Sequence, residues 1–131
     1  MESEFNLVAV LAASVAAMFL GGLWYSPLLF EKRWRQLVDA TDDQEAGNPV
    51  VIYGGAFTLL LLSAAVFHAF LGPNPDFAFA IGVGVAAGVA WAAGSLWISY
   101  LFEGRARGLY FINGGYHIVQ YTVYGMVFGL T

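Results

Sequence analysis

Four long stretches almost free of charged residues constrain this chain more than any other feature of its sequence. They cover about residues 5–26, 50–71, 77–102 and 109–130, and a helix needs only ~20 residues to cross the hydrocarbon layer of a membrane. With 60% hydrophobic and 11% charged residues, a chain of 131 residues could not bury this apolar surface as a small soluble domain. We therefore predict an all-α integral membrane protein with four transmembrane helices, folded as a single domain over residues 1–131.

The connections between these stretches predict the direction of the spans. The first and third connections hold all of the basic residues, namely Lys32, Arg33, Arg35, Arg105 and Arg107. Short loops rich in Lys and Arg stay in the cytoplasm, so we expect both termini outside and the lipid bilayer as the principal partner. The second connection, Gly-Pro-Asn-Pro-Asp, is a tight turn that cannot continue a helix.

The first connection is predicted to contain a short helix over about residues 28–39. Its apolar residues gather on one face and its charged residues on the other, which is typical of a helix in the membrane interface. A surface helix packed on the protein's own cytoplasmic end fits the pattern equally well. Aromatic residues enriched at this level are expected to act as interfacial anchors: Trp24, Tyr25, Phe30 and Trp34.

An internal repeat relates the ends of the first and third spans. Gly-Gly-Leu-Trp-Tyr-Ser-Pro-Leu-Leu-Phe-Glu-Lys-Arg at 21–33 matches Gly-Ser-Leu-Trp-Ile-Ser-Tyr-Leu-Phe-Glu-Gly-Arg at 94–105 when one residue is skipped. Ile-Tyr-Gly-Gly at 52–55 and Ile-Asn-Gly-Gly at 112–115 are a weaker second match. The order of the two matches predicts a duplicated helical hairpin, with Asn113 and His117 only in the second copy.

Small residues at helical spacing predict where these helices pack. Membrane helices associate through small side chains because these let the backbones approach closely. Such residues occur on three spans: Ala9, Ala13, Ala17 and Gly21, then Gly84, Gly88, Ala92 and Ser95, and finally Gly125 and Gly129. The glycine spacing at 82–88 does not fit a nucleotide-binding loop, and no strand precedes it.

Polar side chains form one stripe on the fourth predicted span. At ~100° per residue, Asn113, His117, Gln120 and Tyr124 fall within a narrow sector, and Tyr121 flanks it. An ionisable group at this depth is costly in lipid, so the stripe should face the bundle interior or a wet cavity. The expected partners of His117 are Asn113 and Tyr121, one helical turn away on either side.

Three interpretations of the stripe compete. It can hold helices together by hydrogen bonds, it can bind a small polar solute with His117 as a proton-linked switch, or it can be catalytic. The sequence has no cysteine, no second histidine at metal spacing and no basic stripe, so we expect no metal, no cofactor and no nucleic acid. A lone histidine without a nucleophile partner favours a protein that is not an enzyme.

The turn after the third span is a second candidate. Glu103 lies there within reach of Arg105 or Arg107. An exposed ion pair contributes little to stability. A loop clamp is the simpler interpretation, and a gate at the cytoplasmic mouth of a cavity below His117 is the alternative.

These motifs resemble those of a known family. Trp-Tyr-Ser-Pro closing the first span, Phe-Glu-Gly-Arg after the third and Asn-x-Gly-Tyr-His in the fourth are similar to the bacterial membrane-protein family called domain of unknown function 1761. The resemblance implies a small multi-pass protein of the bacterial cytoplasmic membrane and no particular activity. The matching positions are Trp24, Tyr25, Pro27, Glu103, Arg105, Asn113, Tyr116 and His117, while Gly108 departs from the pattern.

The sequence therefore leaves two functions open. The first is a small-solute or proton-linked carrier or binding protein that uses the polar stripe and forms a homo-oligomer, because four short helices enclose little volume. The second is a non-catalytic structural or assembly subunit of a larger membrane complex, in which the stripe only fixes helix packing.

The orientation can be tested because the chain has no cysteine. In an Arg33→Cys variant, a membrane-impermeant maleimide should label position 33 only after the cells are opened, because the basic loops face the cytoplasm. Labelling of intact cells from outside would overturn this orientation.

Overall fold

The computed structural model describes residues 5–38 and 48–131, and these residues form helices and connecting turns without a strand. The helical elements in chain order are α1 (Leu7–Trp24), α2 (Glu31–Leu37), α3 (Pro49–Leu71), α4 (Phe77–Ala87), η1 (Gly88–Ala93), α5 (Gly94–Glu103), α6 (Arg107–Leu109), η2 (Tyr110–Gly114) and α7 (Gly115–Leu130). The elements η1 and η2 are π-helical, and each continues directly into its neighbours. The prediction of an all-helical fold is confirmed.

Three helices are long and apolar enough to cross a membrane. They are Leu7–Trp24, Pro49–Leu71 and Phe77–Glu103, the last made of α4, η1 and α5. The continuous helix over 107–130 is not among them in the described part of the chain, because its polar residues lower its hydropathy. These helices indicate a membrane protein, and the fourth crossing stays a prediction.

Side-chain caps explain where the long helices begin. The Asn6 side chain accepts a hydrogen bond from the Ala9 N–H, and the Asp76 side chain accepts one from Phe79. Asn48 accepts from Val50, and Pro49 occupies the first turn of α3, where its missing N–H costs nothing. Gly104 ends α5 in the left-handed conformation at φ 69°.

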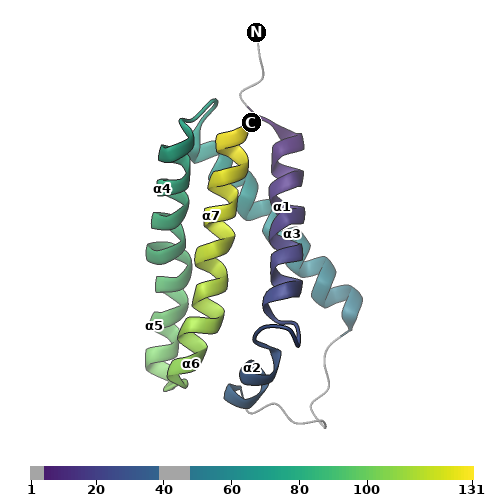
Figure 1. Ribbon diagram of the computed structural model, residues 1–131, viewed down its shortest axis with the longest axis vertical. Helices are drawn as coiled ribbons and strands as arrows, with labels where there is room; N and C mark the ends of the chain where they lie inside the picture. Colours follow the sequence, from purple (N-terminus) through teal and green to yellow (C-terminus); the bar gives the residue numbers. More distant parts are fainter. Residues whose placement is uncertain (1–4, 39–47) are drawn as a thin grey trace.

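The helices are arranged around α7. Figure 1 shows α4 and α5 along one side of α7, α1 along the other, and α3 running obliquely behind α1. Residues of α1, α3 and α7 form one apolar core, with Ala13, Leu60 and Tyr124 among its members. Helix α7 is therefore the central element of the fold.

Glycines bring α4 and the start of η1 into backbone contact with α7. A Cβ on Gly88 would lie 2.8 Å from the Ile118 Cα, and one on Gly84 would collide with the Tyr121 carbonyl. From the other helix, a Cβ on Gly125 would collide with the Ala80 carbonyl, and one on Gly129 would lie 2.9 Å from the Phe77 ring. The small residues of the two helices thus face each other.

Helix α3 contacts the bundle through its C-terminal half. Leu60, Ala64 and Phe67 are buried, whereas Val50 is 78% exposed and Tyr53 is 64% exposed. At the far end, Nε2 of buried His68 accepts a hydrogen bond of 2.9 Å from the Asn6 N–H, and its ring stacks on Phe128 at 4.6 Å. The N-terminal half of α3 diverges from the other helices, as Figure 1 shows.

Helix α2 packs on the protein itself. A Cβ on Gly108 of α6 would collide with the Leu37 side chain, so the absence of a side chain at 108 makes room for α2. Its bounds are shorter than the predicted 28–39, and position 39 lies outside the described residues. The contact favours the surface-helix interpretation, and the lipid contact predicted for this helix stays a prediction.

The glycine contacts predict opposite effects for two substitutions in α4. Gly84→Ala should lower the free energy of unfolding by about 1–3 kcal/mol, because the methyl group would meet the α7 backbone. Gly82→Ala, two residues away with no neighbour within 4 Å, should leave stability unchanged or raise it by up to ~1 kcal/mol. Unfolding by SDS titration in mixed micelles measures both, and similar values for the two variants would contradict the close contact.

Candidate functional site

The π-helical turn η2 is held by two tryptophans from other helices. The Trp24 Nε1–H donates to the Ile112 carbonyl at 2.7 Å, and the Trp97 Nε1–H donates to the Tyr110 carbonyl at 2.9 Å. Where a helix changes between α and π hydrogen bonding, a carbonyl loses its regular partner. In an apolar environment such a carbonyl is stabilised by another donor. Each of the two indoles adds one hydrogen bond to a carbonyl of η2, and the Ile112 carbonyl also accepts from the Gly115 N–H.

The glycines of η2 and α7 make room for these indoles. A Cβ on Gly114 would collide with the Trp97 ring, and one on Gly115 would lie 3.1 Å from the Trp24 ring. The tryptophans occupy matching positions in the predicted repeat, so the ends of the first and third spans contact the same turn. The corresponding Gly54 and Gly55 of α3 have no neighbour within 4 Å.

Asn113 joins the same two helix ends through its side chain. Its Oδ1 accepts a hydrogen bond of 2.6 Å from the Tyr25 hydroxyl, and its Nδ2 donates one of 2.6 Å to the Tyr100 hydroxyl. Both atoms of the amide are thus occupied by protein groups. The expectation that Asn113 is a partner of His117 is wrong, because the wider π-helical turn at η2 directs Asn113 toward α1 and α5.

The predicted interfacial anchors form an aromatic cluster at this end of the bundle. The Trp24 and Phe30 rings lie 5.0 Å apart, and the Tyr25 and Trp34 rings lie 5.9 Å apart with an edge-on geometry. All four side chains are partly buried. They connect α1 to α2, and membrane anchoring by these residues stays a prediction.

His117, Gln120 and Tyr124 form a chain of hydrogen bonds along α7. His117 Nδ1 lies 2.8 Å from Gln120 Oε1, and Gln120 Nε2 donates to the Tyr124 hydroxyl at 2.9 Å. The Tyr124 hydroxyl donates to the Leu60 carbonyl at 3.1 Å and lies 2.8 Å from Ser63 Oγ. The chain therefore begins at His117 and ends on α3. Tyr121 instead packs on Phe67, with ring centroids 5.8 Å apart.

The donors and acceptors along this chain determine which nitrogen of the His117 ring carries the hydrogen. Because Gln120 donates its amide hydrogen to Tyr124, its Oε1 accepts from His117, whose Nδ1 then carries the hydrogen. In the neutral ring, Nε2 is consequently an acceptor. Among the described residues, the only hydrogen bond of the His117 ring is the one to Gln120, so Nε2 remains available to a ligand.

A large pocket lies beside His117 between α3 and the rest of the bundle. Its volume is 1130 Å³, slightly above the ~300–1000 Å³ of common small-molecule pockets. Its walls come from α1, α3, η1, α5 and α7, and most of the lining is apolar, including Met18, Leu59, Leu62 and Val66. His117 and Gln120 lie in its wall, whereas Asn113 and Tyr124 do not line it.

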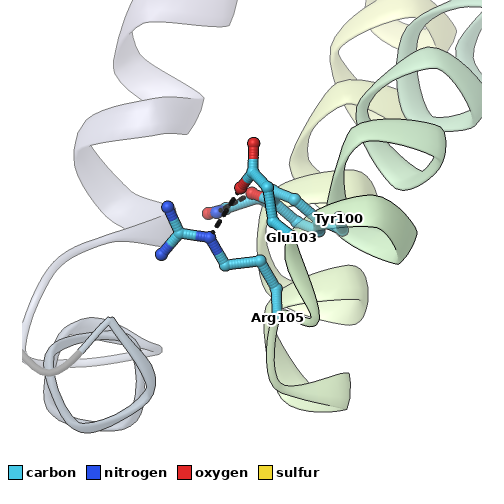
Figure 2. A network of polar contacts seen from close by, with 4 residues as sticks. Tyr100, Glu103 and Arg105 are labelled. Carbon is cyan, nitrogen blue, oxygen red and sulfur yellow. Dashed lines mark hydrogen bonds and ion pairs between the residues drawn. The ribbon is translucent and has the colours of Figure 1, made fainter.

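The ion pair after α5 lies outside this pocket. Arg105 Nε donates to Glu103 Oε1 at 2.8 Å, and both side chains are about half exposed, at 46% and 50%. Figure 2 shows the pair beside Tyr100. The hydrogen bond to Glu103, reinforced by its charge, raises the pKa of Arg105. This geometry favours the loop clamp over the gate, and in the described part of the chain Arg107 takes no part in the pair.

Several residues of the site carried no clear sequence signal. Tyr100 and Ser63 contact the polar stripe but show no spacing that would single them out, whereas the repeat pointed to Trp97 through its match with Trp24. Over residues 5–38 and 48–131, no group of three or more His, Asp or Glu side chains could hold a metal ion.

Comparison with known proteins identifies the family but no function. The profile of a family described as "Protein of unknown function (DUF1761)" matches residues 8–129. The chain belongs to this family. The resemblance noted in the sequence is thereby confirmed, and the matched region of this DUF1761 protein includes η2, the His117 chain and the pocket. No curated protein and no solved structure matches the chain significantly.

The indole hydrogen bonds predict that one tryptophan tolerates phenylalanine and another does not. Trp97→Phe leaves the Tyr110 carbonyl without its donor and should lower the free energy of unfolding by about 1–3 kcal/mol. Trp91→Phe is the control, because Trp91 is 70% exposed and should change stability by less than ~0.5 kcal/mol. Equal losses of unfolding free energy for the two variants, measured by SDS titration, would show that the indole N–H contributes nothing to stability.

Proposed function

We propose that this DUF1761 protein binds a small molecule in the pocket between α3 and α7, with His117 as its polar contact, and serves as a binding protein or carrier. One observation carries the proposal: His117 lines a pocket of 1130 Å³ while its Nε2 has no hydrogen-bond partner among the described residues. A mostly apolar pocket with a few convergent polar groups is the usual form of a small-molecule site.

The neighbouring hydrogen bonds support a selective contact at His117. Gln120 holds the ring from one side and is itself held by Tyr124, whose hydroxyl contacts the α3 backbone. A neutral imidazole held in this way accepts a hydrogen bond at Nε2 and therefore favours a ligand with a hydroxyl or another donor. Protonation of the ring would turn Nε2 into a donor, which is the basis for a proton-linked carrier.

A structural or assembly role is the second candidate, and a specific observation favours it. Asn113 and Tyr124 both hydrogen-bond to other parts of the bundle, at Tyr25, Tyr100, Leu60 and Ser63. These bonds fix helix packing and need no ligand. The polar stripe therefore has two parts. Asn113 and Tyr124 at its ends serve helix packing, and His117 between them is the candidate binding group.

The proposed topology follows the sequence-based expectation. It has four membrane crossings, basic loops in the cytoplasm, both termini outside, and a homo-oligomeric assembly in a bacterial cytoplasmic membrane. Support comes from α2 and α6, which carry basic residues and pack against each other at one end of the bundle (Figure 1). A duplicated hairpin is supported by the matching contacts of Trp24 and Trp97 with η2.

Substitution at His117 tests the binding function. His117→Leu keeps a side chain of similar bulk but removes the acceptor, so affinity for a hydroxyl-bearing ligand should fall about 10–100-fold. The measurement is native mass spectrometry of the molecules that co-purify from mild detergent, together with binding of 1-octanol as a defined hydroxyl probe.

Thr122→Val is the matched control on the same helix. The Thr122 hydroxyl bonds to the Ile118 carbonyl of its own helix and lies outside the pocket, so this variant should bind as the parent protein does. If His117→Leu stays folded and binds unchanged, the binding function is wrong. If His117→Leu loses thermal stability instead, the result supports the packing role.

A further inference from the structure

A second pocket adjoins the first at the end away from the cytoplasmic loops. It has a volume of 280 Å³ and lies between α3, α4 and η1. Three residues, Ser63, Val66 and Tyr121, line both pockets and so form the junction between them. The rest of the second lining consists of apolar and aromatic side chains: Phe67, Phe70, Leu71, Phe79, Val83 and Trp91.

The two pockets together follow one side of α3. Their α3 residues run from Ile52 to Leu71, which corresponds to about 29 Å along the helix axis at 1.5 Å per residue. Tyr124 contacts Leu60 and Ser63 near the junction, and His117 lies two helical turns before Tyr124, or about 10 Å toward the cytoplasmic end. His117 is therefore in the first pocket. Tyr121, which lines both pockets, lies one helical turn from His117, so the second pocket begins about 6–10 Å beyond it.

The lining becomes less polar from the first pocket to the second. In the first pocket, the hydroxyls of Tyr25 and Tyr116 donate to Asn113 Oδ1 and to the Ala17 carbonyl, so they are already engaged. Nε2 of His117 is a free acceptor in this pocket, and the hydroxyl-bearing residues Tyr53 and Ser95 also line it. Beyond the junction, the lining offers almost only apolar side chains. A ligand that fits both parts has a polar group at one end and a hydrocarbon chain at the other.

We propose that the ligand is a single-chain amphiphile whose hydroxyl or protonated acid group binds His117 and whose chain passes the Ser63–Val66–Tyr121 junction into the second pocket. This inference rests on the proposed binding function and names its ligand class. A single chain is favoured because the second pocket holds 280 Å³ against 1130 Å³ for the first. The ligand enters from the bilayer, since the N-terminal half of α3, which lines the first pocket, diverges from the bundle (Figure 1).

The position of the chain end is the property to measure. Lipid tails are as apolar as the pocket, so a longer chain gains little affinity from the hydrophobic effect when it leaves the bilayer. Two photoreactive 1-alkanols with a terminal diazirine, of about four and about sixteen carbons, would report instead where the chain ends. The protein is labelled in phosphatidylcholine nanodiscs, and the labelled peptides are identified by mass spectrometry.

The short probe should label residues of the first pocket near Met18 and Leu59, because its chain ends before the junction. The long probe should label residues of the second pocket near Phe70, Phe79 and Val83. Both labels should be displaced by unlabelled 1-hexadecanol. Long-probe labelling confined to the first pocket would overturn the amphiphile path.

Val83→Trp fills the second pocket while leaving His117 and the first pocket in place. Val83 lines the second pocket and not the first, so a larger side chain there blocks only the far part of the path. Labelling of the second pocket by the long probe should fall about tenfold, whereas short-probe labelling should be unchanged. Val51→Trp is the control, because Val51 is 68% exposed and lines neither pocket.

The outcomes distinguish this inference from the proposed function. If His117→Leu leaves the labelling by both probes unchanged, the binding function itself is wrong. If short-probe labelling requires His117 but Val83→Trp has no effect on the long probe, only the amphiphile path is wrong. Labelling that occurs in detergent and disappears in nanodiscs would mean that two-chain phospholipids fill the pocket, which also overturns the single-chain proposal.

Discussion

The hydrogen bonds from two indole groups to the π-helical turn η2 support the rest of the structure. Inside a membrane, a backbone carbonyl without a partner costs several kcal/mol, so additional donors from neighbouring helices stabilise η2. Trp24 and Trp97 provide them from the ends of α1 and α5. The same contacts fix the rotation of α7 relative to both helices, and this rotation decides which of its side chains face α3.

The polar groups of α7 consequently serve two purposes. Asn113 contacts Tyr25 and Tyr100 and holds the bundle at the level of η2. Two turns further along, Gln120 and Tyr124 connect His117 to the backbone of α3. Because its neighbours are held by protein groups, His117 lies in a rigid setting with one ring nitrogen left for a ligand. Such preorganisation lowers the cost of binding.

Much of the fold followed from the sequence because it depends on local patterns. Runs of apolar residues gave the long helices, and prolines and glycines gave their ends. The two π-helical turns did not follow from local patterns, and the bonding at η2 depends on Trp24, Trp97 and the glycines that receive them. The pairing of His117 with Gln120 was missed for another reason: both lie in the regular helix α7, and helical spacing alone does not say which neighbour one turn away a side chain bonds. The pocket depends on the angle of α3, which no local pattern records.

That angle has a mechanical consequence. Helix α3 has 23 residues and is therefore about 34 Å long, and its buried contacts are concentrated toward the His68 end. A rotation of α3 would therefore pivot about these contacts, near one end of the helix. Geometry alone dictates that a 10° rotation about them would displace the Pro49 end by about 6 Å, so small rearrangements near Phe67 and Phe128 are amplified into large changes in pocket width.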